Sequence, residues 1–328
     1  MLLITAAGTH LGRDLVRHLG AKNYPLRAFD LLDRPWFAGH QAILGDITDP
    51  VAVRRAVRDV ETIVHLAEAN PLRKTVDFPA QADYSDHVQR INYEATRTLA
   101  NAAIKAGVKK FIYASHVSVY GPPPKVCPCT EETPANPHGP FGRSKLAAEE
   151  FLLDKFKQGE LDVVILRLAP VIGPHFIDHR YVEDWLKWKT KRPVQPFFGN
   201  NMALVHFVHV RDALDVIERC LSRPQAAGRV YNIAGRSAAT TLEVFETVDE
   251  TLASHRKMLT LPSSMFPVTN KVAAWLGRPL VYPEFARERF AHSCFAIERA
   301  CNELGWRPKY DTLQAFAEAA AGYLERNR

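Results

Sequence analysis

Apolar and polar positions alternate along the first half of the chain in two distinct patterns. Short, mostly apolar runs predict buried β-strands at residues 1–5, 26–29, 62–66, 110–114 and 163–168. Between them, apolar residues recur every three or four positions, which predicts helices at residues 11–19, 51–60, 87–106 and 140–156. Strand–helix units that repeat with short connections are typical of a parallel sheet with helices on both faces. We therefore expect an α/β protein with a doubly wound parallel sheet of the Rossmann type.

The alternation becomes irregular after about residue 170. Helical spacing returns at residues 211–221, 242–254, 296–304 and 313–325, and a strand is predicted at 230–233. This favours a dinucleotide-binding domain over residues 1–170 and a smaller C-terminal substrate lobe over residues 171–328. We expect the lobe to be interleaved with the last strands of the sheet.

The composition fits a folded, soluble protein. With 328 residues, of which 47% are hydrophobic, the chain can bury a large core. No apolar run approaches the roughly 20 residues needed to span a bilayer, and the chain starts with a strand rather than a signal peptide. The formal net charge is +6, and the densest basic cluster, around Lys187 and Lys189, is interpreted as the solvated face of an amphipathic helix. We expect a cytoplasmic protein that binds neither nucleic acid nor a membrane.

The five cysteines do not form the framework of a small disulfide-rich protein. Cys127 and Cys129 form a Cys-Pro-Cys pair, which is too short to hold a metal ion without two more ligands nearby. No metal site is therefore expected.

The loop between the first strand and the first helix is a candidate phosphate-binding turn. It reads Thr-Ala-Ala-Gly-Thr-His-Leu-Gly over residues 5–12. Glycines in such a loop allow a tight turn and close approach to a pyrophosphate, whose charge the helix N-terminus favours. Gly12 stands where helix and strand pack closely, but Ala6 and Thr9 replace two further glycines and Gly8 is shifted by one position. We expect the Cβ of Thr9 to crowd the pyrophosphate.

Later motifs follow in an order that resembles the extended short-chain dehydrogenase/reductase family, the NAD-dependent epimerase/dehydratase type. Asp30 ends the second predicted strand, where an acid hydrogen-bonds an adenosine ribose and disfavours a 2′-phosphate. The other matches are Gly45-Asp46-Ile47-Thr48-Asp49, Val64-His65-Leu66-Ala67, Asn92, Gly142-x-x-Lys145, Arg167-Leu168-Ala169-Pro170, Phe207-Val208-His209-Val210-x-Asp212, Tyr231-Asn232-Ile233-Ala234-Gly235 and Leu304-Gly305-Trp306-x-Pro308. The resemblance thus covers nearly the whole chain.

The resemblance implies NAD as the cofactor. The positions that match the family's cofactor contacts are Gly8, Leu11, Gly12, Asp30, Asp46, Ile47, Leu66, Ala67, Asn92, Lys145, Pro170 and Val171. His65, His209 and Trp306 are interpreted as packing or loop residues, without a part in the chemistry.

The resemblance also implies where a reaction takes place. The family moves a hydride between nicotinamide and an oxygen-bearing carbon, with a Tyr as acid/base. A Lys four residues later holds the nicotinamide ribose and lowers the pKa of that Tyr, and a Ser or Thr after the fourth strand bonds the substrate oxygen. Lys145 is present here, but Phe141 stands at the Tyr position and His116 at the Ser/Thr position. The candidate catalytic residues are therefore His116, Lys145 and Ser118.

Phe141 cannot carry a proton, and the loss of a positioned acid/base typically lowers a rate by about 10²–10⁴. Three explanations stay open. In the first, His116 takes over proton transfer in an atypical oxidoreductase that acts at a hydroxyl or carbonyl carbon. In the second, His116 and Lys145 serve a non-redox reaction, such as that of a lyase or isomerase. In the third, the chain is a noncatalytic regulatory protein that binds the cofactor or has lost it.

The substrate side departs from the family in one further position. Members that act on nucleotide-diphosphate sugars carry an Arg just before the Phe-x-x-Val-x-Asp strand, where this chain has Val205. We therefore expect a small-molecule substrate other than a nucleotide-diphosphate sugar. The loop with His175, Asp178 and His179 is expected to border the cleft. By analogy with the family, two copies could dimerise through the helices at 87–106 and 140–156.

Overall fold

The computed structural model describes residues 1–70, 81–121, 127–175, 180–191, 194–198, 201–254, 257–265, 268–269, 271 and 292–327. Its centre is a sheet of seven parallel strands in the order β11-β6-β5-β4-β1-β2-β3. The strands are β1 (Leu2–Thr5), β2 (Leu26–Asp30), β3 (Gln41–Leu44), β4 (Thr62–His65), β5 (Lys110–His116), β6 (Asp162–Leu168) and β11 (Arg229–Ile233). The expected Rossmann-type sheet is confirmed. The edge strand β3 was not predicted, because its mostly exposed residues lack a buried apolar run.

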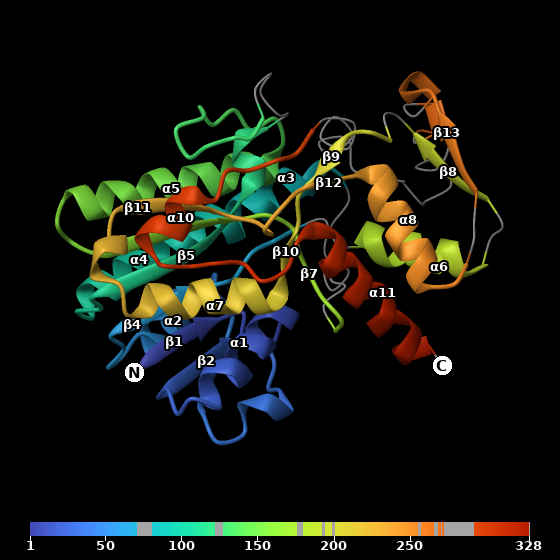
Figure 1. Ribbon diagram of the computed structural model, residues 1–328. Helices are drawn as coiled ribbons and strands as arrows, with labels where there is room; N and C mark the ends of the chain where they lie inside the picture. Colours follow the sequence, from blue (N-terminus) through green and yellow to red (C-terminus); the bar gives the residue numbers. More distant parts are fainter. Residues whose placement is uncertain are drawn as a thin grey trace.

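Helices cover both faces of the sheet (Figure 1). They are α1 (His10–Gly20) and α7 (Val210–Leu221) on one face, and α2 (Pro50–Ala56), α4 (Ala95–Lys105) and α5 (Pro140–Lys157) on the other. Alternation along β1 divides the two cores, since Leu2 and Ile4 face the first set of helices and Leu3 faces the second. Because these strands are buried on both faces, their sequences are continuous apolar runs. Such runs are easily recognised, so the sequence predicts these strands well.

The segment predicted as one helix over residues 87–106 has three parts. The α-helix α3 (Gln81–Gln89) passes into a π-helical turn, η2 (Arg90–Glu94), and then into α4. A π turn carries an extra residue and is often found at functional sites. This one contains Asn92, whose side chain is fully buried. The prediction of a single regular helix was therefore wrong at this turn.

A smaller lobe is formed by later segments of the chain, drawn on the opposite side of Figure 1 from α4 and α5. Its helices α6 (Arg180–Lys191), α8 (Thr241–Thr251) and α11 (Thr312–Asn327) share one core. Short strand pairs accompany them: β7 (Val171–Ile172) with β10 (Val208–His209), β9 (Leu204–Val205) with β12 (Ala239–Thr240), and β8 (Val194–Phe198) with β13 (Lys257–Leu261). The chain returns to the main sheet with β11, which pairs with β6, and ends the main body with α10 (Glu298–Glu303). The boundary at residue 170 stays a prediction.

The basic cluster on α6 is not wholly solvated. Lys189 is fully buried, and its ammonium donates to the Phe245 carbonyl at 3.0 Å and pairs with Asp249 at 2.8 Å. The same ammonium lies 3.5 Å from the centroid of the Phe245 ring. The interpretation of this cluster as a solvated face is wrong for Lys189, which joins α6 to α8. Within the described ranges, no helix combines the length and the apolar character that crossing a membrane requires.

Gly12 sets the distance between α1 and β1. A Cβ added at Gly12 would lie 2.2 Å from the carbonyl oxygen of Ala6 and 2.7 Å from the Cα of Ala7, and both of these are backbone atoms that cannot move aside cheaply. We predict that Gly12→Ala lowers the free energy of unfolding by about 3 kcal/mol, measured by urea denaturation. Gly159→Ala is the control, because open space surrounds that glycine and only its left-handed backbone is penalised, by about 1 kcal/mol. Equal losses in the two variants would contradict the close contact.

Candidate functional site

The carboxyl ends of five parallel strands bring most of the predicted site residues to one edge of the sheet. Asp30 ends β2, and the loop of residues 6–9 follows β1. Leu66 and Ala67 follow β4, His116 ends β5, and Pro170 and Val171 follow β6. In a doubly wound fold this is the edge at which ligands bind. The predicted set is therefore gathered in space, although it spans half of the chain.

The phosphate loop keeps its turn without its usual glycines. Ala6 adopts a left-handed backbone with φ of 51°, which costs a non-glycine residue about 1–2 kcal/mol. Thr9 offsets this cost as the N-cap of α1, since its hydroxyl accepts from the Gly12 amide at 3.2 Å and donates to the Ala6 carbonyl at 2.7 Å. Thr9 therefore has a structural reason to replace glycine: it stabilises the helix whose N-terminus faces the site.

The residues expected at the adenosine end of the cofactor site lie close together. The Asp30 carboxylate accepts a hydrogen bond from the Gly8 amide at 2.8 Å, so β2 and the phosphate loop are joined directly. The Gly45 amide donates to the Asp30 carbonyl at 2.9 Å. This hydrogen bond brings the next two residues, Asp46 and Ile47, close to the carboxyl end of β2. Leu11 is buried in the core beneath the loop. These residues fit an adenosine ribose and an adenine.

His116 closes β5 and points its ring into a turn. Its Nδ1 accepts a hydrogen bond from the Ser118 amide at 3.0 Å, which caps the 3₁₀ turn η3 (Val117–Tyr120). Because a neutral imidazole that accepts at Nδ1 carries its proton at Nε2, this contact fixes the tautomer. His116 in this arrangement is a hydrogen-bond donor through Nε2. It can serve as a base only after the bond to Ser118 breaks.

Phe141 fills the place next to His116. Its ring is fully buried and meets the imidazole edge to face, with centroids 5.3 Å apart. Gly142 makes this approach possible, because a Cβ there would lie 2.6 Å from the Ser118 carbonyl oxygen. The Ser118 hydroxyl is buried, and it has no hydrogen-bond partner among the residues that the structure describes. A buried hydroxyl of this kind is expected to bind a water molecule or a ligand.

Lys145 is held by an acid that the sequence reasoning missed. Its Nζ lies 2.7 Å from a carboxylate oxygen of Glu68 and donates to the Ala114 carbonyl at 2.7 Å. Separating a buried ion pair by removing one partner costs about 3–5 kcal/mol, whereas a hydrogen bond to a charged group contributes about 1.5–3 kcal/mol. A single ligand hydroxyl therefore does not separate Lys145 from Glu68. The available signal was an acid directly after Ala67, where the matched motif ends.

Asn92 fixes the loop that carries Glu68. Its side chain accepts from the Ala69 amide at 2.7 Å and donates to the Ala69 carbonyl at 3.2 Å and to the Ser144 hydroxyl at 3.1 Å. The π turn thus joins the end of β4 to α5. Asn92 acts on the loop backbone in this structure, as a positioning residue.

Pro170 and Val171 form the border towards the lobe. The Pro170 carbonyl accepts from the Val208 amide at 3.1 Å, and Val171 pairs with Val208 in the two-stranded sheet of β7 and β10. His175 ends a described segment, and Asp178 and His179 lie outside the described residues.

Neither Tyr113 nor Tyr120 is suited to replace the missing acid/base. Burial raises the pKa of Tyr113 well above its usual value, and burial also raises the pKa of Tyr120. The Tyr120 hydroxyl donates to Asn232 at 2.6 Å and accepts from Arg167 at 2.9 Å, so it belongs to a structural network. The side chain of Tyr181 lies outside what the structure describes.

The described residues contain no group of three His, Cys, Asp or Glu side chains arranged for a metal ion. Cys294 joins the Cys-Pro-Cys pair, since its carbonyl accepts from the Cys129 amide at 2.8 Å. Burial raises the pKa of the Cys129 thiol to about 11, which leaves it protonated at neutral pH. The buried Cys129 is therefore interpreted as a packing residue.

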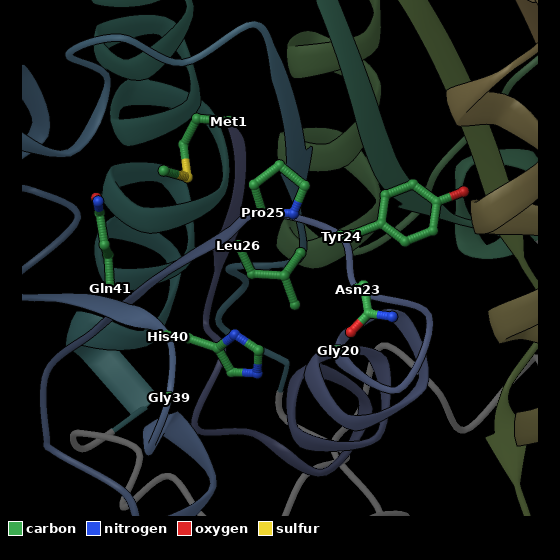
Figure 2. Close-up of a pocket in the computed structure, with 9 residues that line it drawn as sticks. All are labelled: Met1, Gly20, Asn23, Tyr24, Pro25, Leu26, Gly39, His40 and Gln41. Carbon is green, nitrogen blue, oxygen red and sulfur yellow. The ribbon is translucent and has the colours of Figure 1, made fainter.

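A surface pocket of about 350 Å³ lies at the other edge of the sheet (Figure 2). Its lining includes Met1 and Pro25, just before β1 and β2, together with Gly20 at the end of α1 and Gln41 at the start of β3. The pocket lies at the amino ends of the strands, whereas ligands of doubly wound folds bind at the carboxyl ends, where the candidate site lies. The pocket is therefore remote from the candidate site.

Comparison with known proteins agrees with this geometry. A family model described as the NAD dependent epimerase/dehydratase family matches residues 2–234. The chain belongs to this family. A similar sequence is the uncharacterized protein y4nG of Sinorhizobium fredii, 26% identical over 98% of this chain and 78% of that protein. The UDP-glucose 4-epimerase of Vibrio cholerae is 24% identical over 87% of this chain and 83% of the epimerase.

Solved structures of the same kind share the fold of this family member. A short-chain dehydrogenase/reductase superfamily protein of Agrobacterium tumefaciens, solved with bound NAD, is 23% identical, with a TM-score of 0.78 over 100% of this chain and 98% of its own. MoeE5, solved with UDP-glucuronic acid and NAD, is 22% identical, with a TM-score of 0.79 over 100% of this chain and 99% of its own. The expected family is thus confirmed.

His65 lies beneath the site, and its burial makes the stability of the fold depend on pH. The ring is fully buried between the hydroxyls of Thr5 and Thr96, each 2.8 Å away, and burial with the nearby Lys145 lowers its pKa to about 3. Between pH 6.5 and 3 the unfolded chain therefore binds a proton that the folded chain does not. Stability falls as the pH is lowered through this window.

We predict that lowering the pH from 7 to 4.5 removes about 2–3 kcal/mol of stability through His65 alone, measured by urea denaturation at each pH. His65→Gln is expected to be less stable at pH 7 but to lose less on acidification by that amount. His138→Gln on the exposed surface is the control. An unchanged acid dependence in His65→Gln would show that other groups account for it.

Proposed function

We propose that this chain binds NAD and acts at a hydroxyl or carbonyl carbon, with His116 bonding the reacting oxygen. The observation that carries the proposal is the order of groups along the sheet edge. Asp30 stands at the adenosine end, the N-terminus of α1 lies in the middle, and His116 stands at the far end. This is the order of adenosine, pyrophosphate and nicotinamide in the cofactor. Family membership supports the same assignment.

NAD is favoured over NADP because Asp30 remains at the end of β2. Its carboxylate is held by the Gly8 amide and can accept from a free ribose 2′-hydroxyl, whereas a 2′-phosphate would be repelled. The amides at the start of α1 favour the pyrophosphate charge. When bound, NAD supplies the hydride acceptor. The remaining chemistry belongs to residues of the chain.

The tautomer of His116 supports a donor function. Nε2–H would bond the substrate oxygen, as the Ser or Thr of the family does, and Ser118 would assist through its buried hydroxyl. Lys145 acts through Glu68 and positions it. With Phe141 in place of a proton carrier, the proton exchanges with solvent, and turnover is slow. His116 thus orients the substrate rather than replacing the missing base.

The substrate is proposed to lack a nucleotide diphosphate. Val205 stands in β9 where a diphosphate-binding Arg would be expected. The homodimer through α4 and α5 stays a prediction. The lyase or isomerase and the noncatalytic explanations are the outcomes that remain if hydride transfer is not found.

The first test is binding of NADH, followed by its fluorescence, together with a panel of alcohols and ketones followed by nicotinamide absorbance. We expect binding of NADH and weaker binding of NADPH. His116→Ala should lower turnover by about tenfold or more, and His116→Ser, which restores the usual residue, should recover part of it. A protein that binds no NADH contradicts the proposal.

The second test restores the missing hydroxyl. We predict that Phe141→Tyr raises turnover by at least about tenfold, because general acid–base catalysis contributes about 10²–10⁴. The ring of Phe141 lies 5.3 Å from that of His116, and its centroid is 5.9 Å from the Lys145 ammonium, so the restored hydroxyl would belong to a ring that already neighbours both groups. Phe151→Tyr, later on α5, is the matched control. An unchanged rate in a folded Phe141→Tyr protein would mean that proton transfer does not limit turnover.

A further inference from the structure

Glu68 occupies a defined place in the order of groups along the sheet edge. The strands β5, β4, β1 and β2 lie next to one another in that order in the sheet. Because they are parallel, their carboxyl ends all lie at the same edge. Asp30 is the last residue of β2, the phosphate loop follows β1, and Glu68 follows β4. A dinucleotide that lies across this edge with its adenosine at Asp30 and its pyrophosphate at α1 brings its second ribose to the end of β4.

The exposed member of the buried ion pair is the acid. The side chain of Lys145 is 1% exposed and that of Glu68 is 9% exposed, so the carboxylate covers the ammonium. Lys145 also donates to the Ala114 carbonyl beneath it. A ligand that binds at this edge of the sheet therefore meets the Glu68 carboxylate before it meets Lys145.

A carboxylate only accepts hydrogen bonds, and it has about four acceptor positions. The ligand group that it binds must then donate, as a ribose hydroxyl does. We propose that Glu68 is a ribose-binding residue: its carboxylate accepts from the hydroxyls of the second ribose, while Lys145 holds the carboxylate in place. This inverts the usual arrangement, in which the Lys itself bonds the ribose. The inference rests on the proposed NAD binding and assigns one residue of that site.

The carboxylate is held in advance of binding. Asn70 donates to its second oxygen at 3.1 Å, and Lys145 pairs with the first at 2.7 Å. Asn92 fixes the following residue, Ala69, through both its amide and its carbonyl. An acceptor fixed at both oxygens loses little freedom when a ligand binds, and this strengthens the contact.

The experiment compares two ligands on the full chain by calorimetry. NADH contains the second ribose, whereas ADP contains only the adenosine half and the pyrophosphate. We expect Glu68→Gln to weaken NADH binding by about tenfold and to leave ADP binding within about twofold of the original value. Glu61→Gln, an exposed acid just before β4, is the matched control and should change neither.

Glu68→Gln leaves Lys145 without its counter-charge, so a second variant guards against misfolding. The double variant Glu68→Gln/Lys145→Met removes both charges and should show the same selective loss of NADH affinity. Unchanged or tighter NADH binding in the folded variants overturns the inference, and so does an equal loss for ADP. If the wild type binds neither ligand, the proposed function fails as well. If it binds both and the Glu68 variants do not differ, only this inference fails.

Discussion

The ion pair between Arg167 and Glu149 holds together the strand, the turn and the helix that carry His116, Ser118 and Lys145. The Arg167 guanidinium bonds both carboxylate oxygens of Glu149, at 2.7–3.1 Å, in a position where both side chains are almost fully buried. It also donates to Tyr120, and Glu149 accepts from Ser115. One charge pair thus joins β6, α5, β5 and η3. Because a buried pair is stable only when its hydrogen bonds are complete, these four elements have little freedom to shift independently.

The two ends of the candidate site differ from the family pattern to different degrees. At the adenosine end, the contact between Asp30 and the phosphate loop remains, and a capping threonine makes up for a lost glycine. At the reacting end, the polar groups have been redistributed. In the proposed assignment, Phe141 and His116 stand at the positions matched to the family's Tyr and Ser/Thr, and Glu68 pairs with Lys145. The scaffold tolerates these changes because Gly142 and Asn92 still set the spacing of α5 from its neighbours.

Buried parallel strands were predictable because they are apolar on both faces, and the gathering of the site at their carboxyl ends follows from topology alone. Other features depend on contacts across the fold and leave no local signal. The exposed strand β3 has no apolar run, and the π turn at Asn92 lies inside an ordinary helical pattern. In the sequence Lys189 is one of a row of basic residues, but in the fold Asp249 pairs with it from another helix. The pairing of Glu68 with Lys145 could not be predicted for the same reason, because the two residues are 77 positions apart in the chain and only the fold brings them together.

The threonine cap at the start of α1 changes when the ordering of the phosphate loop takes place. A glycine-rich loop keeps conformational freedom in the free protein and loses it when a ligand arrives. Here the hydroxyl of Thr9 fixes both the Ala6 carbonyl and the Gly12 amide during folding. The loop therefore loses its conformational entropy once, when the chain folds, rather than at each binding event. The loop meets its ligand as a rigid surface, and its shape rather than its adaptability sets which phosphate groups it admits.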